Sequence, residues 1–173
     1  MKKVAVEKVD LKRVEEIYHV LLQCSDETDF LACDSSERLK RVPVEIFREF
    51  LESSALTDNE FFICLCSNKV IGMLGLHNEN RKRFSHRISL GMNILKDYWG
   101  MGGGHLLLKA ALDYFHSNKH LTKLELEVRT DNLSAVNLYK KFGFEIEGEI
   151  KNHFCIDSVY YSVYRMTVIK DTL

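Results

Sequence analysis

Proline, tryptophan and long apolar runs are scarce in this sequence. Pro43 is the only proline and Trp99 the only tryptophan among 173 residues. No stretch approaches the roughly 18 consecutive apolar residues of a membrane-spanning helix, so we expect no membrane segment. The basic start, residues 1–7, is followed by a short alternating run instead of the apolar core of a signal peptide. Repeats, low-complexity tracts and linkers are also lacking, which favours one domain over residues 1–173.

An excess of one charge is lacking as well. The 24 Lys and Arg residues nearly balance the 25 Asp and Glu residues, and the resulting net charge of -1 argues against a nucleic-acid partner. None of the five cysteines belongs to a C-x-x-C pair, which favours a reduced, cytoplasmic protein. His116 and His120 stand four residues apart, but no third ligand is evident, so no metal is expected.

Glycine is concentrated in one place, where residues 98–105 read Tyr-Trp-Gly-Met-Gly-Gly-Gly-His. Closely spaced glycines let backbone amides approach a ligand, and a helix that starts behind them adds free N–H groups. The pattern predicts a phosphate or pyrophosphate site. A dinucleotide fingerprint would need a third glycine at His105, and a P-loop would need a Lys-Ser or Lys-Thr pair, so both motifs fail. A tight strand-to-helix turn without a ligand is the alternative.

Apolar periodicity predicts alternating helices and strands. We expect strands over residues 4–6, 61–66, 70–77, 86–95, 124–128, 144–154 and 160–169. We expect helices over residues 10–24, 43–52, 102–117 and 132–142, the first capped by Asp10 and the last closed by Gly143. Residues 25–41 are polar and mixed in sign, which predicts a loop or a broken helix. The order predicts an α+β fold, a mixed sheet with helices on both faces.

Two blocks together resemble a known family. One helix and one strand after the glycine block, the chain reads Asn132-Leu133-Ser134-Ala135-Val136-Asn137-Leu138-Tyr139-Lys140-Lys141-Phe142-Gly143-Phe144. Their order and spacing resemble the GCN5-related N-acetyltransferase (GNAT) superfamily over residues 60–168, and the first third is similar in layout. Residues 142–149 look like the subset that includes ribosomal-protein and spermidine acetyltransferases. The resemblance implies a three-layer αβα fold whose mostly antiparallel sheet splays between its fourth and fifth strands to admit acetyl-CoA.

The resemblance also implies which residues hold acetyl-CoA. The backbone of Met92, Asn93 and Ile94 would pair with the pantetheine arm like an added strand. Asn132 and Asn137 would contact the same arm, although Asn132 also suits a helix cap and Asn137 a solvated surface. The pyrophosphate would lie on the glycine loop, whose expected contacts are Trp99, Gly100, Met101, Gly102, Gly103, Gly104 and His105. The family usually has Arg or Gln in place of Trp99.

Tyr139 is the predicted general acid, because the family places a tyrosine hydroxyl there, near the cofactor sulfur. A phenol with a pKa of about 10 can donate a proton while it remains mostly protonated. Packing of a buried aromatic ring is the alternative. Related chains often carry a glutamate base where this chain has Ser89, and a serine is a poor base unless it is activated. Further candidates, each more often structural, are Glu125, Glu127, His86 and His153; a water chain or an amine that arrives neutral would also suffice.

Acidic residues gather in the two regions that frame the acceptor in this family. They are Asp26, Glu27, Asp29, Asp34 and Glu37, then Glu145, Glu147, Glu149 and Asp157. Such a frame attracts a cationic amine, which predicts direct acetyl transfer to a primary amine of a small molecule such as a polyamine or an amino acid. A solvated acidic face is the alternative. Acetylation of protein N-termini and a non-catalytic acyl-CoA sensor are the competing functions. Family members are often dimers, so a homodimer is also expected.

Overall fold

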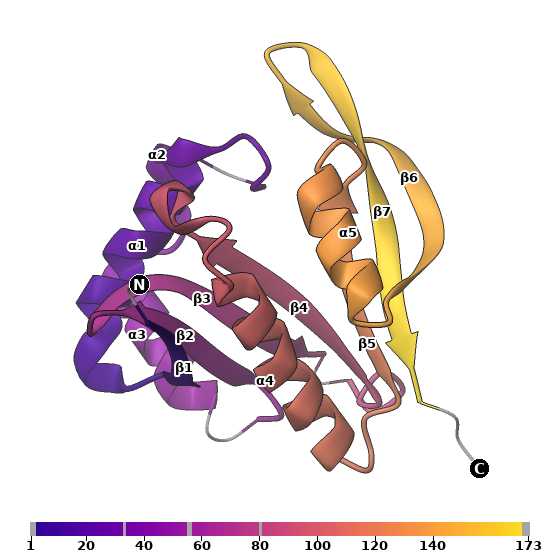
Figure 1. Ribbon diagram of the computed structural model, residues 1–173, viewed down its shortest axis with the longest axis horizontal. Coiled ribbons are helices and arrows are strands. Elements are labelled where there is room, and N and C mark those ends of the chain that lie inside the picture. Colours follow the sequence, from indigo (N-terminus) through magenta and orange to yellow (C-terminus); the bar gives the residue numbers. More distant parts are fainter. Residues whose placement is uncertain (1–2, 33, 55–56, 80, 171–173) are drawn as a thin grey trace.

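The computed structural model describes residues 3–32, 34–54, 57–79 and 81–170. In this part of the chain, one seven-stranded sheet has the order β1-β2-β3-β4-β5-β7-β6 (Figure 1). Its strands are β1 (Val4–Lys8), β2 (Glu60–Cys66), β3 (Lys69–Asn78), β4 (Arg87–Ile94), β5 (Lys123–Arg129), β6 (Glu145–Ile156) and β7 (Val159–Ile169). The helices are α1 (Val14–Glu27), α2 (Ser35–Arg41), α3 (Val44–Ser53), α4 (Gly103–Ser117) and α5 (Leu133–Lys141), with short 3-10 turns η1 (Leu11–Arg13) and η3 (Lys96–Tyr98).

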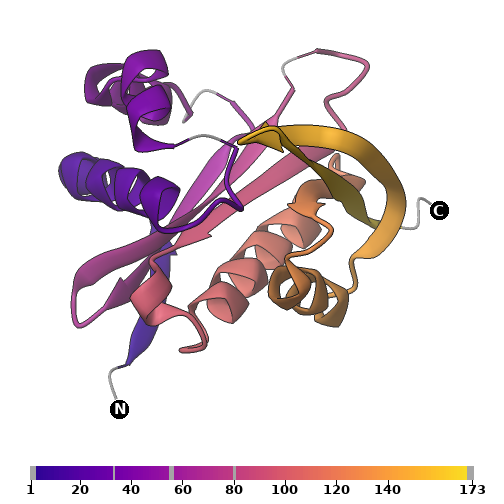
Figure 2. The ribbon, with the colours of Figure 1, turned by 90° about the horizontal axis from the view of Figure 1, so that it is seen from above.

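Helices cover both faces of the sheet (Figure 2). α1 and α3 pack on one face, where the core contains Ile17, Leu21, Leu51, Ile63 and Met73. α4 and α5 pack on the other face, where the core contains Leu74, Leu107, Phe115, Leu124 and Val136. Successive side chains of a strand point to opposite faces, so the central strands β2 and β3 contribute to both cores. The predicted three-layer α+β fold is confirmed.

The sheet splays between its fourth and fifth strands, as predicted. β4 and β5 run parallel, and they pair only at Arg87↔Lys123, Ile88↔Leu124 and Ser89↔Glu125. β4 continues to Ile94 and β5 to Arg129, so the two strands diverge beyond their third pair. The other pairings among the described strands are antiparallel. An opening therefore separates β4 from β5 at the end where both strands finish.

The segment predicted as a loop or broken helix contains a helix of its own. α1 extends to Glu27, and α2 follows after a short connection. The Asp34 side chain accepts a hydrogen bond from the amide of Glu37 at 2.8 Å and caps α2, which explains how a polar sequence starts a helix there. Two boundaries shift slightly. Asp10 caps η1, which precedes α1, and Pro43 is the N-cap of α3 instead of its first helical residue.

Candidate active site

The glycine loop leads from η3 into α4, and its glycines meet separate demands. Gly100 has φ of 76° and Gly102 has φ of 89°, a left-handed region that other residues enter at a cost. Gly103 lies where α4 crosses close to the sheet, and a Cβ atom there would stand 3.0 Å from the Cys64 sulfur. Backbone conformation and helix packing therefore require glycine at these positions, in addition to any demand from a ligand.

The N-terminus of α4 presents free backbone donors. Gly102 is the N-cap and provides no side-chain hydrogen bond, and the first turn contains no acidic residue. The amide of Leu106 donates to the carbonyl of Gly102 at 3.2 Å. The preceding amides, those of Gly103, Gly104 and His105, have no acceptor within the helix. These N–H groups and the positive end of the helix dipole suit a pyrophosphate, so the loop fits the predicted cofactor contact.

The edge of β4 that faces β5 is open beyond Ser89. β3 pairs with the opposite edge of β4 as far as Ile94. The indole Nε1 of Trp99 donates to the carbonyl of Ile94 at 2.7 Å, which occupies one of the predicted pantetheine contacts from within the chain. A Cβ atom at Gly91 would meet no atom within 4 Å, so space is available over this face of the strand. The open edge suits an extended amide chain such as pantetheine.

The second predicted block lies on α5. Tyr139 is 7% exposed, and its ring centroid lies 5.7 Å from that of Phe144. Burial raises the pKa of Tyr139 to about 12, so its hydroxyl stays protonated at neutral pH, as a general acid requires. The Asn132 side chain accepts from the amide of Ala135 at 3.2 Å and caps α5, which leaves its NH₂ group as the available donor. Asn137 is exposed on the helix surface.

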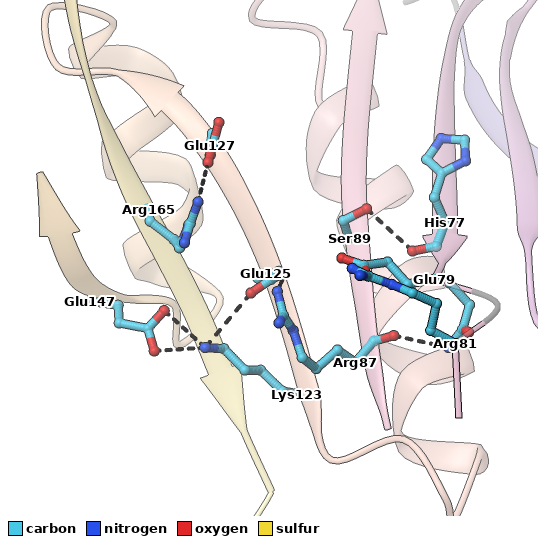
Figure 3. Close-up of polar contacts among 11 residues, drawn as sticks. His77, Glu79, Arg81, Arg87, Ser89, Lys123, Glu125, Glu127, Glu147 and Arg165 are labelled. Carbon is cyan, nitrogen blue, oxygen red and sulfur yellow. Dashed lines mark hydrogen bonds and ion pairs between the residues drawn. The ribbon is translucent and has the colours of Figure 1, made fainter. Parts of the chain in front are cut away.

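A row of charged side chains crosses the sheet on the face covered by α1 and α3 (Figure 3). Leu124, Leu126 and Val128 point to the opposite core, so the charged residues of β5 share this face. Glu125 lies between two cations, with Arg87 at 2.5 Å and Lys123 at 3.6 Å. Lys123 also donates to Glu147 at 2.6 Å. These ion pairs occupy the closed end of the splay, where β4 and β5 are still joined.

Glu127 lies on the wall of the opening itself. It is two residues beyond the last β4–β5 pair, and continuing that register places it level with Gly91. Its Oε1 atom accepts from Arg165 at 2.7 Å (Figure 3). Its Oε2 atom is 3.3 Å from Nε2 of His153. Its side chain is 35% exposed. Of the predicted candidates for the base, Glu127 is the one whose carboxylate is both accessible and beside the open edge.

His153 reaches Glu127 from an irregular part of β6. The register between β6 and β7 shifts between Ile150 and Phe154, and Asn152 has a positive φ of 52°. An irregularity of this kind bends a strand and re-aims its side chains. The His153 side chain is 33% exposed, so the imidazole contacts both Glu127 and solvent.

Among the residues that the structure describes, no side chain forms a hydrogen bond that would activate Ser89. Its hydroxyl donates to the backbone carbonyl of His77 at 3.2 Å (Figure 3). The His77 imidazole instead packs against Phe50 and Phe61, with ring centroids 5.7 and 5.3 Å away. Ser89 is therefore unsuited to act as a base. His86 directly precedes β4 at the closed end of the splay, where its carbonyl accepts from the amides of residues 122 and 123.

Many of the acidic residues predicted to frame the acceptor have structural partners. Asp26 accepts from the amide of Ser35 at 3.0 Å, and Asp34 caps α2. Glu27 accepts from the amide of Lys96 at 2.6 Å. Glu37 pairs with Arg41, and Glu147 pairs with Lys123. Glu145, Glu149 and Asp157 are exposed on the β6–β7 hairpin. The frame consequently offers less uncompensated negative charge than its composition indicates.

Arg129, at the end of β5, was not singled out in the sequence. It is 6% exposed, and its guanidinium donates to both carboxylate oxygens of Asp131, at 3.0 and 2.6 Å. It also donates to the backbone carbonyl of Asp29 at 2.8 Å. The sequence carries a local sign of the ion pair, because Asp131 follows Arg129 by two residues. The contact with Asp29 joins residues one hundred positions apart and has no such signal.

Comparison with known proteins decides the family. The model of the Acetyltransferase (GNAT) family matches residues 17–144. The chain belongs to the GNAT acetyltransferase family. It is therefore an acetyl-CoA-dependent N-acetyltransferase, as predicted. This GNAT enzyme is similar to a GNAT-family acetyltransferase from Streptococcus pneumoniae, whose crystal structure has a TM-score of 0.91 and 30% identity, with 97% of this chain and 100% of that chain covered.

Two curated relatives of the GNAT enzyme are named for different amine substrates. The spermidine N(1)-acetyltransferase of Escherichia coli K12 is 29% identical over 133 residues, which cover 73% of this chain and 70% of the relative. The L-amino acid N-acetyltransferase AaaT of the same organism is 30% identical over 101 residues, which cover 58% of this chain and 62% of the relative.

The described residues contain no group of three or more His, Cys, Asp or Glu side chains that could hold a metal ion. His116 lies in the last turn of α4, and Nε2 of His120 is 3.2 Å from Asp58. Cys24, Cys64 and Cys66 are buried free thiols, Cys155 is an exposed one, and Cys33 lies outside the described residues. None of the described helices has the length and apolar character needed to cross a membrane.

Proposed function

We propose that this GNAT enzyme transfers acetyl groups from acetyl-CoA directly to the primary amine of a small molecule in the opening between β4 and β5. The proposal rests on how the edge of β4 and the Glu127 side chain lie relative to each other. The unpaired edge of β4, with free space at Gly91, faces the accessible carboxylate of Glu127 on β5. Direct transfer requires these features side by side: an edge that holds an extended thioester arm and a base that accepts the proton of the amine.

Backbone groups provide most of the contacts that bind acetyl-CoA in this proposal. The amides of Gly103, Gly104 and His105 bind the pyrophosphate at the N-terminus of α4. The backbone of Met92 to Ile94 pairs with the pantetheine arm, and an amide of this strand polarises the thioester carbonyl. Asn132 and Asn137 add side-chain contacts from α5. Acetyl-CoA supplies the acetyl group in activated form, as a thioester.

Two side chains move protons. Glu127 accepts the proton that the amine loses as its nitrogen bonds to the acetyl carbon. Arg165 fixes the orientation of this carboxylate, and His153 connects it to solvent. Tyr139 donates a proton to the sulfur as the carbon–sulfur bond breaks, which its raised pKa permits because the hydroxyl is protonated at neutral pH.

The charges around the opening favour an amino-acid-like acceptor over a polyamine. Glu125, Glu127 and Glu147 each have a cationic partner on the same face. A face with balanced charge attracts a polycation weakly, whereas it can satisfy both the ammonium and the carboxylate of an amino acid. One relative is named for spermidine and the other for L-amino acids, and both names support a small-molecule amine as the acceptor.

A panel of amines tests the proposal. Release of free thiol from acetyl-CoA is measured with L-amino acids, polyamines and peptides with free N-termini, and native mass spectrometry of the purified protein detects bound coenzyme A. We expect the greatest acceleration with an amino acid. Acceleration by peptides alone would favour a protein N-terminal acetyltransferase. Binding of acetyl-CoA without acceleration by any amine would favour an acyl-CoA sensor and would refute the proposal.

The predicted cytoplasmic location, homodimer and single domain over residues 1–173 stay predictions.

A further inference from the structure

The open end of the splay lacks the backbone bonds that hold the rest of the sheet together. Pairing between β4 and β5 ends at Ser89↔Glu125, and β5 runs four residues further to Arg129. One wall of the opening therefore belongs to the first half of the chain and the other to β5 and β7. Figure 1 shows the connection between α1 and α2 reaching from the first half toward this end of β5. Some other contact must fix the spacing of the two walls here.

Arg129 supplies such a contact. Its Nη1 atom donates to the carbonyl of Asp29, in the connection that follows α1, at 2.8 Å. Its guanidinium carbon lies 5.0 Å from the ring centroid of Phe30 and 3.6 Å from that of Tyr161 on β7. Asp131 holds the other edge of the guanidinium through two hydrogen bonds. One side chain thus joins the α1–α2 connection to β5 and β7. We call this group the Arg129 strap: Asp29, Phe30, Arg129, Asp131 and Tyr161.

Burial indicates that the strap is a fixed part of the site. The Arg129 side chain is 5% exposed, and a guanidinium is rarely buried unless its hydrogen bonds are satisfied. Each of its three nitrogens donates to an oxygen in the strap. A planar, bidentate fork that also stacks on aromatic rings is specific to arginine, since lysine offers only a point charge on a flexible stem. The geometry of the strap therefore depends on this residue type.

The strap stands next to the proposed base. Arg129 and Glu127 are alternate residues of β5, so their side chains share the face covered by α1, roughly 7 Å apart along the strand. Through its contacts with Arg129, the Asp29–Phe30 segment lies over the end of β5 two residues beyond Glu127.

We propose that Arg129 is a positioning residue for the acceptor: through the strap it fixes the Asp29–Phe30 wall across the open end of the splay and so sets acceptor affinity. The inference rests on the proposed function, because it assumes that the acceptor amine meets Glu127. The Arg129 side chain donates to Asp29 and Asp131 and to none of the predicted acetyl-CoA contacts. Its backbone carbonyl accepts from the amide of Asn132 at 3.0 Å, a bond that a side-chain substitution leaves in place. Its loss should therefore affect acceptor binding selectively.

Arg129→Met tests the inference. It keeps the length of the side chain but removes the charge and the fork. We expect the KM for the acceptor to rise about tenfold, equivalent to about 1.4 kcal/mol, while kcat and the Kd for acetyl-CoA change less than about twofold. Hydrogen exchange of the amides of residues 29–31 should become faster in the variant without any substrate. Arg129→Lys should show a smaller rise in KM, because it retains the charge but not the fork.

Arg48→Met is the matched control. Arg48 on α3 also forms an ion pair, with Glu15, and donates to a backbone carbonyl, that of Leu11, but it lies away from the opening. It should leave the KM for the acceptor unchanged. Should Arg129→Met fail to fold, Phe30→Leu loosens the same wall without unpairing the guanidinium, and it should raise the acceptor KM in the same direction.

The outcomes separate this inference from the proposed function. An unchanged acceptor KM in Arg129→Met, or in Phe30→Leu if only that variant folds, overturns the inference and leaves the proposed function intact. A fall in kcat at constant KM also overturns it, because a merely structural role reduces the active fraction without changing acceptor affinity. If the wild-type protein acetylates no amine, the proposed function fails, and the inference fails with it.

Discussion

Replacing Tyr139 by Phe removes a single hydroxyl from a side chain that is 7% exposed and keeps the ring against Phe144. Because the ring packing is retained, the fold should persist. Loss of a general acid lowers kcat by about 10²- to 10⁴-fold, equivalent to about 3–5 kcal/mol of transition-state stabilisation. The Kd for acetyl-CoA should change less than about twofold, since most of the proposed contacts are main-chain groups at the N-terminus of α4 and along β4.

The same substitution has a calculable effect on stability at high pH. Burial raises the pKa of Tyr139 from 10.0 to about 12, so between these values an unfolded chain ionises this phenol and the folded protein does not. The stabilising contribution is complete below pH 10 and is lost as the pH rises toward 12. By pH 11 the loss is about 1.4 kcal/mol, one pK unit. The free energy of unfolding of Tyr139→Phe should therefore fall less than that of the wild type between pH 9 and pH 11.

Two assays check this prediction. Thiol release at saturating acetyl-CoA and acceptor gives kcat from pH 7 to pH 10, and urea unfolding at pH 9 and pH 11 gives the difference in stability. Tyr114→Phe is the control, because the Tyr114 hydroxyl donates to the carbonyl of Asp58 at 3.1 Å, outside the opening. Its kcat should equal that of the wild type. Turnover of Tyr139→Phe equal to wild type across the pH range would remove Tyr139 from the mechanism.

Three further changes probe the face on which the acceptor is proposed to bind. Glu127→Gln should lower kcat by at least about 10²-fold, while the free energy of unfolding changes by less than about 1 kcal/mol because its ion pair with Arg165 is partly exposed; wild-type turnover would exclude Glu127 as the base. Gly91→Leu fills open space on the wall of the opening, so acetylation should be lost at an unchanged Tm; a fully active variant would show that this space is not used. Burial lowers the pKa of His77 from 6.5, so the folded protein loses stability as the pH falls below that value and the unfolded chain becomes protonated. His77→Phe should be less sensitive to acid in thermal denaturation at pH 7.5 and pH 5, and equal sensitivity would contradict this origin.

Most of the fold could be predicted because its helices and strands carry a strong apolar periodicity. The strands of the central sheet and helices α1, α3, α4 and α5 lie close to their predicted ranges. α2 could not be predicted in the same way, since none of its residues is buried and no apolar face marks it. The splay followed from the family resemblance. Periodicity within a strand says nothing about where a neighbouring strand diverges.

The site was predicted where it depends on local sequence and not where it depends on tertiary contacts. The glycine loop and the α5 block are contiguous, so the sequence could single out their residues as candidates, and their roles stay predictions. The glycines were predicted from ligand access alone, whereas the structure adds left-handed conformations at Gly100 and Gly102 and a close approach to the sheet at Gly103. In the sequence, Glu127 is one of several equal candidates for the base. In the structure, it is distinguished by His153 of β6 and Arg165 of β7, which lie beside it.

The junction of three residue pairs between β4 and β5 also separates the sheet into two consecutive stretches of chain. Strands β1 to β4, on one side of the junction, therefore leave the ribosome before β5, β6 and β7 on the other side. A nascent chain can thus complete its first four strands while the outer edge of β4 is bare, and bare strand edges recruit strands from other chains. Further along, the proposed mechanism keeps that edge bare for acetyl-CoA. The opening that the proposed mechanism requires is therefore also an edge at which newly made copies can pair with one another.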